Sequence, residues 1–139
     1  MSVSHRLAFR RLYQYDNRAS GIPIPVALSV GRESLSLLAN LDTGSSVCIF
    51  RRDHGEALGL SLERGIPQRI RTATGTFETF GHMVSLAVLG MRFEALIYFA
   101  RSPEITRAVL GRTGFLDRVR LGLIDYDRNL YVSAYDDAL

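Results

Sequence analysis

The sequence predicts a single all-β domain, built as a compact barrel or sandwich, and three observations lead to this prediction. The chain has 139 residues, a length typical of one domain. Its apolar fraction of 47% is enough for a hydrophobic core and argues against disorder. Short alternating runs separated by glycine-containing turns follow one another, with no long helical pattern, and this is typical of barrels and sandwiches.

Three pairs of alternating apolar runs predict three β-hairpins. In the first, residues 24–30 and 35–41 alternate on either side of a Gly-Arg-Glu turn. In the second, residues 69–81 alternate on both sides of Gly75. The third joins two apolar runs, both within residues 83–100, at Gly90 and Met91, and should be largely buried.

The remaining segments are less regular. Residues 51–65 predict one or two helical turns and a loop, and Pro103 prevents a simple strand from continuing through the next connector. Residues 108–119 begin as a strand, break at a glycine and end in a short helix, and two final strands should occupy 120–135. Residues 1–20 are expected to form an N-terminal arm that pairs with another strand, outside the core and outside the domain of residues 21–139.

Cysteine and histidine usage excludes several kinds of site. The single cysteine, Cys48, rules out an intramolecular disulfide and a cysteine-based metal cage, and its apolar surroundings predict a buried thiol. The three histidines, His5, His54 and His82, lack metal-ligand spacing, so no metal or other cofactor is expected. His54 and His82 are expected at the surface.

Charge and hydropathy limit the partners. The formal net charge is +3 and every basic side chain except histidine is arginine, but the arginines are scattered among acids without an aromatic–basic stripe. No nucleic-acid partner is therefore expected. No apolar run approaches the roughly 18–20 residues of a membrane span, and the N-terminus lacks the apolar region of a signal peptide. We expect a cytoplasmic protein with no membrane partner.

One carboxylate stands where an apolar strand ends. The run LLANLDTGSSVCIF, residues 37–50, places Asp42 before Thr43 and Gly44. A carboxylate amid apolar residues is costly unless it is hydrogen-bonded or functional. It could simply cap the amides of its own turn. The motif alone does not decide between these two roles, but a glycine-tipped hairpin at Gly75 and a strand that ends in Val-Leu-Gly-Arg follow it in the chain.

Together these motifs resemble those of the retropepsin-like aspartic proteases, the single-domain relatives of pepsin. The resemblance lies in LLANLDTGSS (37–46), TATGTF (72–77) and AVLGRTGF (108–115), and the order and spacing hold over residues 24–132. The ending GRTGFLD (111–117) is more similar to bacterial members than to viral ones. The resemblance implies a closed β-barrel of the acid-protease fold, with a flap hairpin and one short helix, and the activity of an aspartic endopeptidase without a cofactor.

The resemblance also implies a homodimer in which each chain supplies Asp42. The sequence agrees, because it contains one Asp-Thr-Gly and has no room for a second lobe. The tails, residues 1–20 and 129–135, would be candidates for strands between subunits. Two carboxylates about 3 Å apart share one proton, and the ionised one activates a water that attacks the scissile carbonyl of an extended peptide. In this family, apolar side chains flank the cut.

Further roles follow from the same resemblance. Thr43 would hydrogen-bond across the dimer axis, Gly44 would give the turn its freedom and approach the substrate, and Ser45 would hydrogen-bond near the two aspartates. Thr74, Gly75 and Thr76 would form the flap, which closes over the substrate. A ψ-loop would contain Leu110 and Gly111, and Arg112 would brace the dimer or the active-site loop.

Two questions stay open at this point. Viral relatives place an acid where this chain has Ser46, so the partner of Arg112 is open, with Asp117 and Asp53 as candidates. The second question is how mobile the flap is, because it has one central glycine and not a glycine-rich tip. The alternative to an enzyme is a non-catalytic dimerisation or peptide-binding module of the same fold. The intact Asp-Thr-Gly favours the enzyme, because a scaffold has no need of a buried carboxylate pair.

Overall fold

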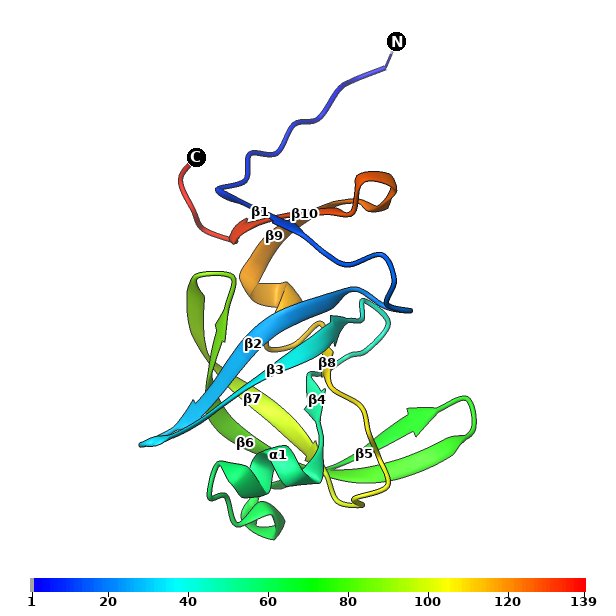
Figure 1. Cartoon of the computed structure of the whole chain (residues 1–139), viewed down its shortest axis with the longest axis vertical. Helices are drawn as coiled ribbons and strands as arrows, with labels where there is room; N and C mark the ends of the chain where they lie inside the picture. The colour runs from blue at the N-terminus through cyan, green and yellow to red at the C-terminus, as the bar shows by residue number, and fades with distance from the viewer. Residues whose placement is uncertain (1) are drawn as a thin grey trace.

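The protein is described here by a computed structural model that covers residues 2–139 (Figure 1). It consists mainly of β-strands, with one short α-helix and three single 3-10 turns. The strands are β1 (Arg11–Gln14), β2 (Pro23–Val30), β3 (Glu33–Leu41), β4 (Ile49–Phe50), β5 (Ile66–Thr72), β6 (Gly75–Val88), β7 (Met91–Ala100), β8 (Val109–Leu110), β9 (Val119–Ile124) and β10 (Asn129–Ala134). The helical segments are α1 (Arg52–Ala57), η1 (Leu62–Arg64), η2 (Leu116–Arg118) and η3 (Asp125–Asp127).

Seven strands form one sheet that closes on itself. Their order is β2-β3-β8-β4-β7-β6-β5, and β2 also pairs with β6, from Val26 opposite Val88 to Ser29 opposite Ser85. This extra pairing closes the strands from β2 to β6 in that order into a barrel, with β5 attached to β6 outside the closure, so that alternate side chains point into a shared interior. The closed all-β barrel with a short helix that the sequence predicted is confirmed.

The three predicted hairpins are present. They are β2–β3, β5–β6 and β6–β7, which turn at Val30–Glu33, Thr72–Gly75 and Val88–Met91 respectively. One difference is that β6 is a single strand of 14 residues shared by two hairpins. Its buried positions change phase between Gly81 and Val84 while the pairing with β7 stays in register. The alternation therefore looks like two separate runs in the sequence.

The two tails form a second sheet within the same chain. The order is β1-β10-β9, with β1 antiparallel to β10 from Arg11 opposite Val132 to Gln14 opposite Asn129. Figure 1 shows this sheet at one end of the barrel, with both chain termini beyond it. The expectation that the N-terminal arm lies outside the core is wrong for Tyr15, which is 5% exposed and donates a hydrogen bond to Asp125.

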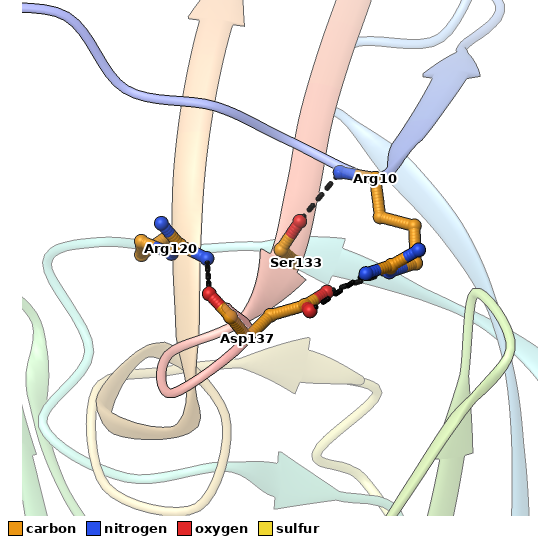
Figure 2. Close-up of polar contacts among 4 residues, drawn as sticks. All are labelled: Arg10, Arg120, Ser133 and Asp137. Carbon is orange, nitrogen blue, oxygen red and sulfur yellow. Dashed lines mark hydrogen bonds and ion pairs between the residues drawn. The ribbon is translucent and has the colours of Figure 1, made fainter. Parts of the chain in front are cut away.

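A polar cluster fastens the N-terminal arm to the C-terminal end (Figure 2). The Arg10 backbone amide donates to Ser133 Oγ at 2.6 Å, and the Arg10 guanidinium makes two parallel bonds to the Asp137 carboxylate at 2.7 and 2.8 Å. Arg120 donates to the backbone carbonyl of Asp137 from the other side. The guanidinium of Arg10 lowers the pKa of Asp137 below its usual range.

One continuous core fills the barrel and extends under the tail sheet. Its largest fully buried side chains are Phe50, Phe99, Phe115, Ile24, Leu28, Ile49, Leu58, Leu62, Leu86, Ile97, Leu110 and Leu130. The predicted burial of Cys48 is confirmed. The surface placement of two histidines is wrong. Both are half-buried, with His82 Nε2 2.9 Å from the Leu62 carbonyl oxygen and His54 Nδ1 accepting from the Arg51 amide at 3.3 Å.

None of the helices in residues 2–139 has the length and apolar character needed to cross a membrane.

Candidate active site

Asp42 lies directly after β3, at the point where that strand runs parallel to β8. Asn40 and Leu41 pair with Val109 and Leu110, and the Asp42 backbone amide donates to the Leu110 carbonyl at 2.9 Å. The pairing of these two segments, which are far apart in the sequence, therefore fixes the residue at which the chain leaves the sheet. The position of Asp42 is a consequence of barrel closure, and not only of its own turn.

The turn after β3 is held by the carboxylate itself. The Gly44 amide donates to Asp42 Oδ1 at 3.0 Å, and the Ser45 amide donates to the Asp42 carbonyl at 3.2 Å. The Asp42 side chain is half-buried, and its Oδ2 accepts no hydrogen bond from the residues that the structure describes. One carboxylate oxygen thus caps the turn, as the simpler interpretation required, while the other keeps its lone pairs for a further partner.

The segment after the turn runs beside the segment after β8. The Arg112 amide donates to the Ser45 carbonyl at 2.9 Å, the Thr113 amide donates to the Ser46 carbonyl at 3.0 Å, and Val47 forms a parallel bridge with Thr113. Ser45 Oγ donates to the Val47 carbonyl at 2.7 Å, so Ser45 braces its own loop. These bonds bind the two loops into one rigid unit beneath Asp42.

Gly111 sits at the tightest point of this unit. A Cβ atom added there would lie 2.2 Å from the Val47 carbonyl oxygen and 2.7 Å from that of Ser45. Both neighbours are backbone atoms that cannot swing away, so only glycine fits. The Gly111 amide points at Cys48 Sγ at 3.4 Å, and burial raises the pKa of the Cys48 thiol to about 11. Cys48 is therefore a neutral packing group below the site.

The predicted flap is the tip of the β5–β6 hairpin. Thr72 Oγ1 donates to the Gly75 carbonyl at 2.9 Å and accepts from the Thr74 amide at 3.4 Å. Gly75 has a φ of 146°, a conformation that side chains with a Cβ rarely adopt. Thr74, Gly75 and Thr76 are all exposed. In Figure 1 this hairpin extends away from the barrel, next to the connector between β7 and β8.

A cleft of about 210 Å³ lies against Asp42. One wall comes from the Asp42 turn and the loop after it, the other from β5, and the connector before β8 contributes one residue. The lining residues are Asp42, Gly44, Ser45, Ser46, Val47, Gln68, Arg69, Ile70, Arg71 and Arg107. The geometry thus brings Asp42, Gly44 and Ser45 to one cleft, but it places Thr43 and the flap tip outside the lining.

Sequence reasoning missed the second wall of the cleft. The alternation of Arg69 and Arg71 leading to the flap glycine was visible, but it was assigned only to hairpin structure. Gln68 and Ile70 share that strand. Nothing in the sequence marks Arg107, because a connector residue reaches the cleft only through the path of the folded chain.

Arg112 does not pair with either expected partner. The Asp53 carboxylate is bound by Arg51 at 2.7 Å, and Asp117 Oδ1 accepts from the Gly114 amide at 3.0 Å. Within residues 2–139 the guanidinium of Arg112 makes no ion pair and is exposed. Both candidate partners are therefore wrong for a single chain, and the bracing contact of Arg112 in this chain is its backbone bond to Ser45.

A metal site finds no support in the side chains. No group of three or more histidine, cysteine, aspartate or glutamate residues in the described part of the chain could hold a metal ion.

The closed barrel and the Asp-Thr-Gly turn beside the cleft define an acid protease of the single-domain type. A family model described as "Aspartyl protease" matches residues 26–113, and the chain belongs to this family. The match begins within β2 and covers the rest of all three hairpins, the Asp42 turn and β8. The protein is accordingly an aspartic-type peptide hydrolase, as the resemblance implied.

Solved structures agree on the fold. A retropepsin-like aspartic protease from Rickettsia conorii is similar with a TM-score of 0.64 and 18% identity, covering 88% of this chain and 97% of that one. The EIAV protease in complex with the inhibitor HBY-793 is similar with a TM-score of 0.54 and 22% identity, covering 70% of this chain and 86% of that one. No curated protein sequence matches the chain.

Proposed function

We propose that the protein is an endopeptidase that works as a homodimer, in which Asp42 of each chain supplies one carboxylate of a shared catalytic pair. The observation that carries this proposal is the Asp42 turn, which lines the cleft, is fixed to β8 and leaves one carboxylate oxygen without a partner in residues 2–139. A single chain offers one such aspartate, and peptide hydrolysis by this chemistry needs two.

The proposed mechanism needs only these two carboxylates and a water. At about 3 Å separation the pair holds one proton. The ionised Asp42 takes a proton from the water as its oxygen attacks the scissile carbonyl carbon. The protonated Asp42 donates to the carbonyl oxygen, and a proton then passes to the leaving amine as the C–N bond breaks. No covalent enzyme intermediate forms.

The neighbouring residues would support this chemistry. The Gly44 amide, which already donates to Asp42 Oδ1, holds the carboxylate in its orientation. Thr43 is exposed and would hydrogen-bond to the partner chain's turn. Thr74, Gly75 and Thr76 would move over a bound peptide and exclude water. Arg112, which has no ion-pair partner in residues 2–139, would find one on the partner chain or the substrate.

The tail sheet supports the dimer. Its strands and the adjoining tails expose apolar side chains at one end of the molecule, and its outer strands β1 and β9 each have one edge unpaired within residues 2–139. The exposed apolar residues are Leu7, Leu12, Leu123, Ile124, Tyr126 and Tyr135. Exposed apolar side chains next to open strand edges suit a contact between two copies of the chain.

The test compares the wild-type protein with Asp42→Asn on a diverse peptide library, read by mass spectrometry from pH 4 to 7 at high protein concentration. We expect wild-type cuts that fall at least about a thousandfold in Asp42→Asn. Glu33→Gln is the control, because Glu33 is exposed at the β2–β3 turn and lies outside both the cleft and the tail sheet. Sedimentation velocity under the same conditions should show a dimer.

Two results would contradict the proposal. Equal cutting by Asp42→Asn would exclude Asp42 as a catalytic residue. A measured dimer that cuts nothing would favour the second reading, a binding module that keeps the protease fold.

A further inference from the structure

The cleft beside Asp42 carries an excess of positive charge. Three of its lining side chains are arginines, Arg69, Arg71 and Arg107, and Asp42 is its only lining carboxylate. The three arginines come from two segments, β5 and the connector between β7 and β8. Figure 1 shows these segments adjacent to each other at one end of the barrel. The charge is therefore assembled by the fold and not by a run of basic residues.

Within residues 2–139, one of the three arginines is neutralised by an ion pair and two are not. Arg69 pairs with Glu78, its cross-strand neighbour on β6, at 3.2 Å. Arg71 lies two residues further along β5, opposite Thr76 on β6. Arg107 lies in the connector between β7 and β8. Both are exposed, and neither side chain makes an ion pair or hydrogen bond with any residue in 2–139. Each of these two guanidinium groups at the cleft thus has all five of its N–H donors available for a ligand.

We propose that Arg71 and Arg107 select substrates with acidic side chains in the cleft, at positions that are not adjacent to the scissile bond. The proposal rests on the protease function proposed above and specifies the substrate class. A guanidinium binds a carboxylate through two parallel hydrogen bonds, which gives both strength and orientation. The acidic residue would lie away from the bond that is cut, because a carboxylate placed against the aspartate pair would be repelled.

An acidic peptide suits this cleft better than a nucleic acid. The apolar side chains of Val47 and Ile70 line the same space, and Asp42 and Glu78 place negative charge beside the arginines. A phosphate backbone needs a continuous basic track, which these carboxylates interrupt. In an extended peptide, successive side chains point in opposite directions. Apolar side chains can therefore contact Val47 and Ile70 while acidic ones contact Arg71 and Arg107.

The proposed two-fold symmetry makes the inference more specific. Each chain of a homodimer would bring its own Arg71 and Arg107, so a positive pair would flank the aspartate pair on both sides. Acidic residues should therefore be preferred both before and after the cut. A preference confined to one side would contradict this symmetric form.

The experiment uses matched peptides that differ only by glutamate or glutamine at one position. Peptides cut in the library are resynthesised with each substitution, and kcat/KM is compared for wild-type protein and the Arg71→Gln/Arg107→Gln double variant. We expect wild type to prefer glutamate by about threefold to tenfold, and the ratio of kcat/KM between glutamate and glutamine peptides to fall to about one in the double variant. Arg32→Gln is the matched control, because Arg32 is exposed in the β2–β3 turn and does not line the cleft.

A binding measurement separates this inference from the protease proposal. Fluorescence anisotropy with Asp42→Asn protein reports peptide affinity without any cleavage. Tighter binding of glutamate peptides that disappears in Asp42→Asn/Arg71→Gln/Arg107→Gln supports acidic recognition even if wild type cuts nothing. Equal affinity for glutamate and glutamine peptides overturns it even if wild type is an active protease. A single-stranded oligonucleotide that binds more tightly than the acidic peptides, through the same two arginines, would also overturn it.

Discussion

The backbone amide of Asp42 and the carbonyl of Leu110 are joined by a hydrogen bond of 2.9 Å. This bond ties the candidate catalytic turn to β8, which enters the barrel as a parallel neighbour of β3. The position of the carboxylate therefore depends on a segment near the other end of the domain. Changes in residues 109–113 should disturb the site as strongly as changes in the turn itself.

Gly111→Ala should destabilise the protein strongly. The new Cβ would meet the Val47 and Ser45 carbonyl oxygens at 2.2 and 2.7 Å, and both belong to the loop that follows Asp42. We expect the free energy of unfolding to fall by about 3 kcal/mol or more, measured by urea denaturation. Gly75→Ala is the comparison, because an added Cβ there meets no atom within 4 Å and only the positive φ is strained. It should cost about 1–2 kcal/mol. Equal losses would mean that the loops separate easily.

Thr72→Val should loosen the flap without unfolding the protein. The hydroxyl of Thr72 donates to the Gly75 carbonyl and accepts from the Thr74 amide, and valine keeps the shape without these bonds. We expect the Thr74 amide to exchange faster with solvent, KM to rise by about twofold to fivefold, and the free energy of unfolding to fall by less than about 1 kcal/mol. Thr76→Val is the control, because it removes an exposed hydroxyl. In this variant the rate at which the Thr74 amide hydrogen exchanges with solvent should not change. Unchanged exchange in Thr72→Val would show that strand pairing alone orders the tip.

Cys48 should resist thiol reagents in the folded protein. Burial raises its pKa to about 11, and the thiolate is the reactive species. At pH 8 we expect alkylation by iodoacetamide to be slower than for the urea-unfolded chain by about a hundredfold or more, because both the thiolate fraction and access fall. Mass spectrometry of timed samples measures the two rates. Similar rates would indicate that the loop above Cys48 opens frequently.

The Arg10–Asp137 pair should make the attachment of the tails sensitive to acid. The pKa of Asp137 is lowered by Arg10, so its contribution to stability is complete above the ordinary aspartate range and is lost as the pH falls through the lowered value. Asp137→Asn should therefore destabilise the protein near neutral pH and make little difference in strong acid. Thermal unfolding from pH 7 to pH 2 measures this difference.

Asp136→Asn is the control for that series, because Asp136 is exposed and makes no ion pair within residues 2–139. An NMR titration of the carboxyl groups gives a direct check. The Asp137 midpoint should move back toward its ordinary value in Arg10→Gln. A midpoint that stays low in that variant would assign the shift to another group, such as Arg120.

Local patterns in the sequence determined the hairpins and the likeness to the aspartic proteases. Alternation in residues 24–41 and 69–100 fixed which side chains face the interior, because a strand exposes every second residue to one face. The turn after Asp42 is similarly local, because the Asp42 carboxylate accepts a hydrogen bond from the Gly44 amide two residues further on. For these features neighbouring residues were sufficient.

Only the tertiary structure decided the pairing of distant segments. The sequence predicted that residues 1–20 pair with another strand, but only the folded chain shows that β1 pairs with β10 and that Tyr15 is buried. The phase change within β6 likewise depends on which layer covers each part of the strand. Arg71 and Arg107 meet at the Asp42 cleft because the chain path brings them there. Sequence patterns record which face of an element is buried, whereas the charges that gather around a site depend on how distant elements pack.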